Sequence, residues 1–103
     1  MSTSKQDAPI PSIVSLKDLS GKEIPDGGTT TDTSVIIAGL AEKMQRVEVL
    51  DGAMSSGLAS VDSAGNWMFQ MKRLSVGAHS VTAKALYGAG AVSAARTFTV
   101  VLK

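Results

Sequence analysis

The sequence predicts an all-β fold in which about seven antiparallel strands form a sandwich of two sheets. Short segments alternate apolar and polar residues, the pattern of half-buried strands. Turn-forming residues separate these segments at intervals of about 8 to 14 residues. No segment of the 103 residues carries the apolar stripe of a helix. The best helical candidate, residues 36–47, is interrupted by Gly39 and contains β-branched residues, so we reject it.

The first residues are polar and predict a flexible tail or linker over residues 1–11, followed by one domain over residues 12–103. A strand is expected at 12–17. Residues 18–28 are rich in turn formers and predict two turns around a short edge piece at 22–24. A run of hydroxyl residues then leads into a strand at 34–41. Its predicted buried set is Val35, Ile37, Gly39 and Ala41.

The next strand is predicted at 46–50, where Val47 and Val49 share one face. Asp51-Gly52 predicts a tight turn before a strand at 57–61. Gly65 suits the following bend, because glycine adopts positive φ without strain. The last strand is expected at 92–102, after a turn at residues 88–90. Its predicted inward residues are Phe98, Val100 and Leu102.

The clearest pattern lies in residues 65–85, which predict strands at 66–72 and 79–87 and a corner between them. The first strand places Trp67, Phe69 and Met71 on one face. The second places Val81, Ala83 and Ala85 on one face. The corner contains Leu74, Gly77 and His79. This stretch is expected to form the centre of the core.

Composition narrows the classes of function. Ten basic and nine acidic side chains give a net charge of +1 without a block of like charge longer than Lys72-Arg73, which argues against nucleic-acid binding. No segment is apolar enough to insert into a membrane. There is no cysteine, hence no disulfide, no thiolate nucleophile and no cysteine-based metal site. The N-terminus lacks the apolar run of a secretory signal, so the signal of an exported protein would lie outside this chain. We expect the chain to be a domain of a longer polypeptide.

Several phrases, taken in order, resemble the bacterial immunoglobulin-like (Big-type) repeats of large surface and secreted proteins, adhesins included. They are IPDGGTTTD, VIIAGLA, VEVLDGA, DSAGNWMFQM and LSVGAHSVTAKAL. In these repeats a Val-x-Val-x-Asp-Gly phrase ends the third strand and a Gly-x-Trp opens the fifth. A Leu-x-x-Gly-x-His or Tyr corner leads into the sixth. The resemblance covers about residues 12–102 and implies an immunoglobulin-like sandwich, in which Val81 takes the place of the second cysteine of animal domains.

His79, the only histidine, is considered first as a base, metal ligand or pH switch. The residue at this corner of immunoglobulin-like domains usually hydrogen-bonds to the backbone of the preceding loop, and we expect His79 to do the same. A Ser-His-Asp triad is compatible with the composition, but no Gly-x-Ser-x-Gly elbow is present. The aspartates beside turn glycines are expected to shape turns. They are Asp18, Asp26, Asp51 and Asp62.

No catalytic residue, cofactor or metal is therefore assigned. Calcium stays an alternative, because loop carboxylates suit it, but no dense acidic loop is present. Trp67 is expected to be a core residue, with a sugar-stacking platform as the alternative. Three methionines are candidates for an exposed contact surface: Met44, Met54 and Met68.

The sequence thus predicts a non-catalytic structural spacer or adhesion repeat, outside the cell or on its surface, with neighbouring repeats as partners. A surface glycan or a protein is the expected ligand, if there is one. The alternative is a carbohydrate- or ligand-binding module attached to a catalytic domain. An independent enzyme is the weakest hypothesis, because no nucleophile, base and pocket are found together.

Overall fold

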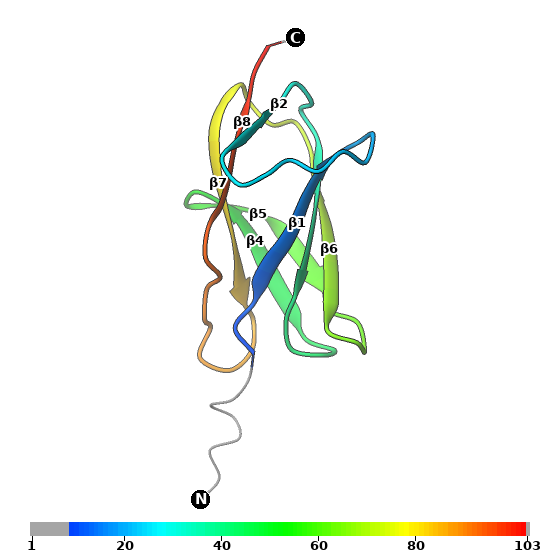
Figure 1. The fold of residues 1–103 in the computed structure, drawn as a ribbon. Coiled ribbons are helices and arrows are strands. Elements are labelled where there is room, and N and C mark those ends of the chain that lie inside the picture. Colours follow the sequence, from blue (N-terminus) through cyan, green and yellow to red (C-terminus); the bar gives the residue numbers. More distant parts are fainter. Residues whose placement is uncertain (1–8, 103) are drawn as a thin grey trace, which may run out of the picture.

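Two sheets face each other in a computed structural model that describes residues 9–102 (Figure 1). The smaller sheet has the order β1 (Ser12–Asp18), β3 (Val35–Leu40) and β6 (Asn66–Met71). The larger has the order β2 (Gly28–Thr30), β8 (Arg96–Val100), β7 (Gly77–Ala85), β4 (Arg46–Asp51) and β5 (Met54–Ser60). The predicted all-β sandwich is confirmed, with eight strands in the described residues. Within residues 9–102 no helix is long and apolar enough to cross a membrane.

Strands β1 and β2 belong to different sheets, and this corrects the prediction of a purely antiparallel sandwich. β1 pairs antiparallel with β3, whereas β2 pairs parallel with β8. Asp26 fastens the crossing chain, because its Oδ1 accepts bonds from the backbone N and the Oγ1 of Thr97, at 2.8 and 3.1 Å. The predicted edge piece at 22–24 is a single bridge between Lys17 and Glu23. β2 and β8 are far apart in the sequence, so no turn joins them directly and no local turn signal predicts their pairing.

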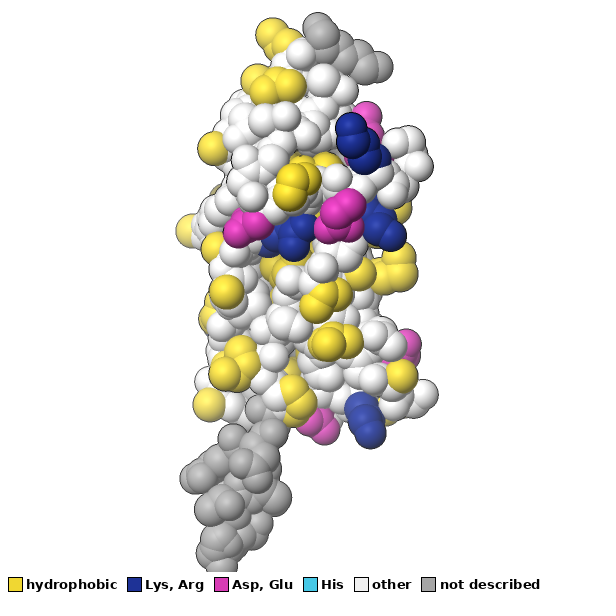
Figure 2. Space-filling model, in the orientation of Figure 1, with side chains coloured by type: hydrophobic (Ala, Val, Ile, Leu, Met, Phe, Trp, Pro, Cys, Tyr) yellow, Lys and Arg dark blue, Asp and Glu magenta, His cyan; other side chains and the backbone are white. Residues whose placement is uncertain are grey.

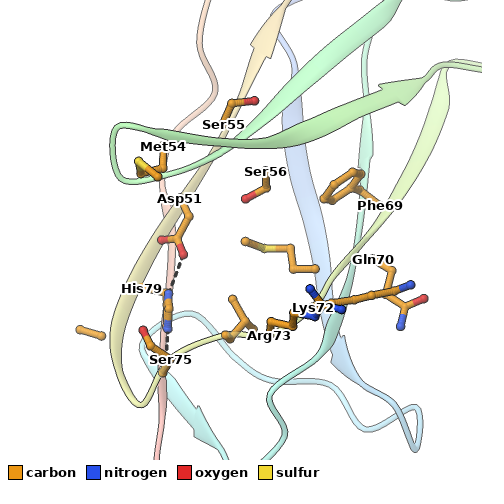
Figure 3. A pocket seen from close by; sticks show the side chains of 13 residues that line it. Asp51, Met54, Ser55, Ser56, Phe69, Gln70, Lys72, Arg73, Ser75 and His79 are labelled. Carbon is orange, nitrogen blue, oxygen red and sulfur yellow. Dashed lines mark hydrogen bonds and ion pairs between the residues drawn. The ribbon is translucent and has the colours of Figure 1, made fainter.

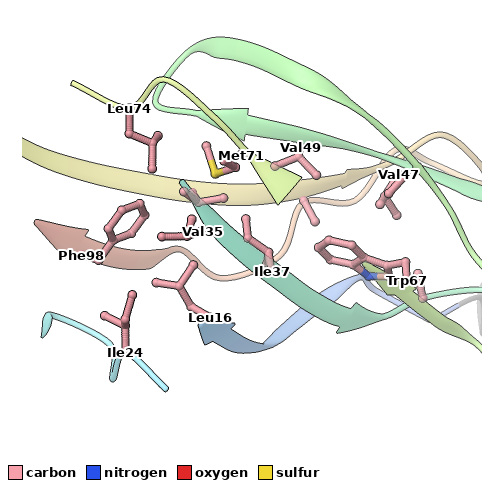
Figure 4. Packing of buried hydrophobic residues seen from close by; sticks show 14 of the residues in the cluster. Leu16, Ile24, Val35, Ile37, Val47, Val49, Trp67, Met71, Leu74 and Phe98 are labelled. Carbon is pink, nitrogen blue, oxygen red and sulfur yellow. The ribbon is translucent and has the colours of Figure 1, made fainter. Parts of the chain in front are cut away.

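The core lies between the sheets and consists mainly of aliphatic side chains around Trp67 (Figure 4). Trp67 is 2% exposed, and its Nε1 donates a hydrogen bond to Leu40 O at 3.2 Å. The alternation predicted for β3 and β4 is confirmed, because Val35, Ile37, Val47 and Val49 are fully buried. The platform alternative for Trp67 is wrong, since its ring is not accessible.

Gly39 allows β1 and Trp67 to approach β3 closely. A Cβ atom on Gly39 would overlap Ser12 O and lie 2.5 Å from Cζ2 of Trp67. Glycine within a strand often marks such a close approach of another group. The small residue in β3 therefore sets how deeply the indole enters the core.

Both ends of the domain differ from the expectation. The last strand is shorter than residues 92–102, because Val92 forms only an isolated bridge with Lys84 and β8 begins at Arg96. Leu102 was expected to point inward but is 80% exposed, since it lies beyond the end of β8. At the other end Pro11 is buried and Pro9 O accepts a bond from Tyr87 Oη. Residues 1–8 of the predicted tail lie outside the described residues.

Candidate binding groove beside the His79 corner

A groove of about 760 Å³ lies between β5 and β6, next to the corner that joins β6 to β7 (Figure 3). One wall is the β4–β5 hairpin from Asp51 to Ser56, and the other is the continuous segment from Phe69 to Ser75. This volume is within the usual range for ligand sites, about 300–1,000 Å³. The groove is larger than two other hollows in the described residues, which have volumes of about 490 and 300 Å³.

A bulge shapes the β5 wall. Val49 pairs with Gly57 and Leu50 with Ser55, so Ser56 has no partner on β4. Gly57 has φ of 144°, and a Cβ there would lie 2.8 Å from Cζ of Phe69. An extra residue of this kind bends an edge strand and redirects its side chains. The bend brings the Phe69 ring against the backbone of β5, where it closes the inner end of the groove.

His79 is held at both ring nitrogens. Nδ1 lies 2.7 Å from Oδ2 of Asp51, and Nε2 lies 2.7 Å from the backbone oxygen of Ser75. The ring stacks on Phe98 with centroids 5.2 Å apart and planes 18° apart. His79 is 8% exposed. The imidazole therefore joins the end of β4, the corner and β8 at one point, and it includes the contact with the preceding loop that the sequence predicts.

The two partners of His79 are both acceptors. A neutral imidazole has a single N–H, whereas a protonated imidazole has one on each ring nitrogen. Both contacts are therefore hydrogen bonds when His79 is protonated. Burial lowers the pKa of His79, but the bonds to Ser75 O and Asp51 and the charge of Asp51 raise it, and the balance lies above the ordinary 6.5.

The Asp51–His79 contact has the geometry of half a catalytic triad, in which a carboxylate orients Nδ1 and Nε2 takes a proton from a hydroxyl. Here Nε2 is bound to a main-chain carbonyl, and Ser75 supplies its backbone oxygen to that contact. No free ring nitrogen faces the groove. The arrangement can fasten strands together, but in this form it cannot act as a general base.

Asp51 does not have the turn-shaping role that was expected for it. The turn residues of the β4–β5 hairpin are Gly52 and Ala53, and φ of Gly52 is 62°. Asp51 lies in β4 and directs its carboxylate to His79, 28 residues later in the sequence. A hydrogen bond across that separation has no local sequence signal. The other carboxylates also serve the fold: N–H bonds from Asn66 and Ala64 hold the pKa of Asp62 below its ordinary 3.8.

Two exposed basic residues, Lys72 and Arg73, stand at the mouth of the groove (Figure 3). Neither belongs to an ion pair within residues 9–102, where the salt bridges are His79–Asp51 and Arg96–Glu23. Arg73 has φ of 58°, a conformation that is uncommon for a residue with a side chain. The mouth therefore carries positive charge without a compensating acidic side chain.

The other residues expected at the corner lie around this groove or behind it. Leu74 is 7% exposed, and its backbone N donates to Thr33 O at 2.9 Å. Phe69 is half-buried, Gly77 begins β7 with φ of 130°, and Val81 is fully buried.

The part of the chain that the structure describes contains no group of three histidine or acidic side chains suited to a metal ion. Acidic and basic side chains alternate on the face presented in Figure 2.

Comparison with known proteins supports the fold. No family model and no curated protein matches the chain. Among solved structures, the fibronectin(III)-like modules of Clostridium thermocellum CbhA are similar, with a TM-score of 0.65 and 14% identity. The match covers 91% of this chain and 98% of that chain. Identity at this level leaves the narrower resemblance to Big-type repeats a prediction. The chain is thus an immunoglobulin-like β-sandwich, of the kind seen in fibronectin(III)-like modules.

Proposed function

We propose that this chain is a non-catalytic module that acts as a spacer between neighbouring domains of a larger extracellular or cell-surface protein. The observation that carries the proposal is the position of the two chain ends. β1 begins at one end of the long axis and β8 finishes at the other (Figure 1). The structure extends 56 Å along this axis and 25 and 20 Å across it. Each copy joined end to end would therefore add nearly its full length to the protein, and only a short linker would be needed between copies.

Two further observations support this role. The core lies between the two sheets, so the module is a compact unit with a hydrophobic core of its own. The fibronectin(III)-like modules that share the fold are described as modules of CbhA. An adhesion role rests on the resemblance to repeats of surface proteins. Unlike the spacer role, it would require the module to bind a ligand.

Small-angle X-ray scattering on two copies joined through their own termini tests the spacer role. We expect a maximum dimension close to twice the 56 Å length of one copy. A control with a long Gly-Ser linker should give a broader distribution of distances, because such linkers behave as flexible coils. A directly joined pair that folds back to nearly the length of one copy would contradict the proposal. The size of the native polypeptide that carries this segment provides an independent check.

The alternative, a carbohydrate- or ligand-binding module attached to a catalytic domain, receives mixed support. Trp67 is the only tryptophan, and its burial removes the expected platform for a sugar ring. The groove beside His79 favours a ligand of a different chemistry, because its mouth is basic.

A further inference from the structure

We propose that the groove between β5 and β6 binds an extended acidic peptide segment of a partner protein. The proposal goes beyond the spacer role and does not depend on it. It combines the strand edges that flank the groove, the unpaired basic residues at its mouth and the exposed apolar side chain of Met54 on its wall.

The first observation is that the groove lies between two unpaired strand edges. β5 is hydrogen-bonded only to β4, and β6 only to β3, within the described residues. The segment Met54–Ser60 contains no charged residue and no proline, two of the features by which natural edge strands prevent pairing; another, a bulge, is confined to Ser56. An extended peptide can add to such an edge through main-chain hydrogen bonds. The part of β5 that lines the groove is Met54 to Ser56, on the hairpin side of the point where Phe69 packs against Gly57.

The second observation concerns charge. Lys72 and Arg73 are exposed and belong to no ion pair within residues 9–102. The only acidic side chain on the groove wall is Asp51, and its carboxylate is already bound to His79. A ligand with carboxylates would therefore meet two free cations and no competing anion. Complementary charge of this kind increases specificity and the rate of association.

The third observation distinguishes a peptide from a sugar. The rings on the groove wall are Phe69, which is half-buried, and His79, which is 8% exposed. Phe69 packs against Gly57, and His79 stacks on Phe98. Met71 and Leu74 line the groove but are buried, whereas Met54 on the opposite wall is 74% exposed. The Met54 side chain can contact an apolar side chain of an extended peptide whose neighbouring residues carry the carboxylates.

A titration of the ¹⁵N-labelled protein with acetyl-Thr-Glu-Val-Glu-Thr-amide, followed by amide chemical shifts, tests the proposal. We expect shifts confined to residues 54–60 and 69–75, with binding weakened by added salt. The Lys72→Glu/Arg73→Glu variant should bind at least about tenfold more weakly, since two favourable charge contacts become repulsive. The matched control Lys43→Glu/Arg46→Glu makes the same change in net charge on exposed residues outside the groove and should retain binding.

Three further arms test the individual steps. The peptide with glutamine in place of glutamate should bind more weakly, and equal binding would overturn the acidic preference. N-methylation of the valine removes a backbone donor, so undiminished binding would overturn strand addition. An acidic oligosaccharide such as oligogalacturonate should bind more weakly than the peptide, and tighter binding would overturn the choice of ligand class. Shifts elsewhere on the sandwich, or equal losses in both charge-reversal variants, would overturn the site itself.

Discussion

His79 makes two hydrogen bonds to acceptors, and this gives the fold a titratable contact. Nδ1 reaches Asp51 and Nε2 reaches Ser75 O, so both contacts are hydrogen bonds when His79 is protonated. The sequence identifies the corner, because Leu74, Gly77 and His79 are close together in it. It does not identify Asp51, because the two side chains are 28 residues apart and meet only when β4 lies beside β7.

We expect this contact to make stability depend on pH near neutrality. The pKa of His79 is raised in the folded state, so its contribution is fully present below the unfolded value near 6.5 and is lost as pH rises through the folded pKa. At pH 5.5 His79→Gln should cost about 2 kcal/mol, the usual range for hydrogen bonds to charged groups. Urea unfolding of both proteins between pH 5 and 9 measures this. The difference should shrink toward pH 9, and parallel profiles would show that the pair is not titrating.

At the scale of elements, β2 is the least expected part of the fold. It has only three residues, and its parallel partner β8 lies at the other end of the chain. Bonds beyond the ladder help to hold it: Gly27 N donates to Thr97 O, Val101 N donates to Thr30 O, and Asp26 binds Thr97. The carboxylate of Asp26 thus joins two segments that no turn brings together.

Asp26→Ala should loosen β2 without opening the rest of the sandwich. Amide hydrogen exchange should become faster at Gly27, Thr97 and Val101, whereas amides shared by β4 and β7 should keep their protection, because local openings can occur independently of global unfolding. Asp18→Ala is the matched control: this carboxylate lies in the same connection, but its bonds go to Ser20 and Lys22 within the turn. Faster exchange at β2 in the control as well would show that the whole loop, and not Asp26, holds the strand.

At the scale of the molecule, both sheets share one core, so a change at its centre affects the stability of the whole domain. Gly39→Ala places a Cβ against Ser12 O and the Trp67 ring. Ser12 O is a backbone atom of the paired strand β1, so it cannot easily move away. Overpacking of this kind costs about 3 kcal/mol. Thermal unfolding should show a single transition at lower temperature. In the control, Gly21→Ala, φ is 90° and no atom lies within 4 Å of the new Cβ, so about 1 kcal/mol is expected from backbone strain alone.

The two-layer architecture could be predicted because its signals are local. Alternation of apolar and polar residues over a few positions predicts that Val47, Val49 and Trp67 point inward, and this signal does not depend on distant parts of the sequence. The features missed are those that depend on distant neighbours. The parallel pairing of β2, the bulge at Ser56 and the groove all arise only when strands from remote parts of the sequence come together. Lys72 and Arg73 were visible as the longest run of like charge, but their lack of ion-pair partners was not.

The parallel pairing of β2 with β8 also has a consequence for biosynthesis. A ribosome makes the chain from the N-terminus, so residues 28–30 leave the exit tunnel long before residues 96–100 do. β3 follows β1 closely and can pair with it early, but the place of β2 in the larger sheet stays open until β8 has been made. During that interval the edge is available to a chaperone or to the same strand of a neighbouring copy. In a polypeptide with several such modules, a correct assembly would require each one to close before the next emerges.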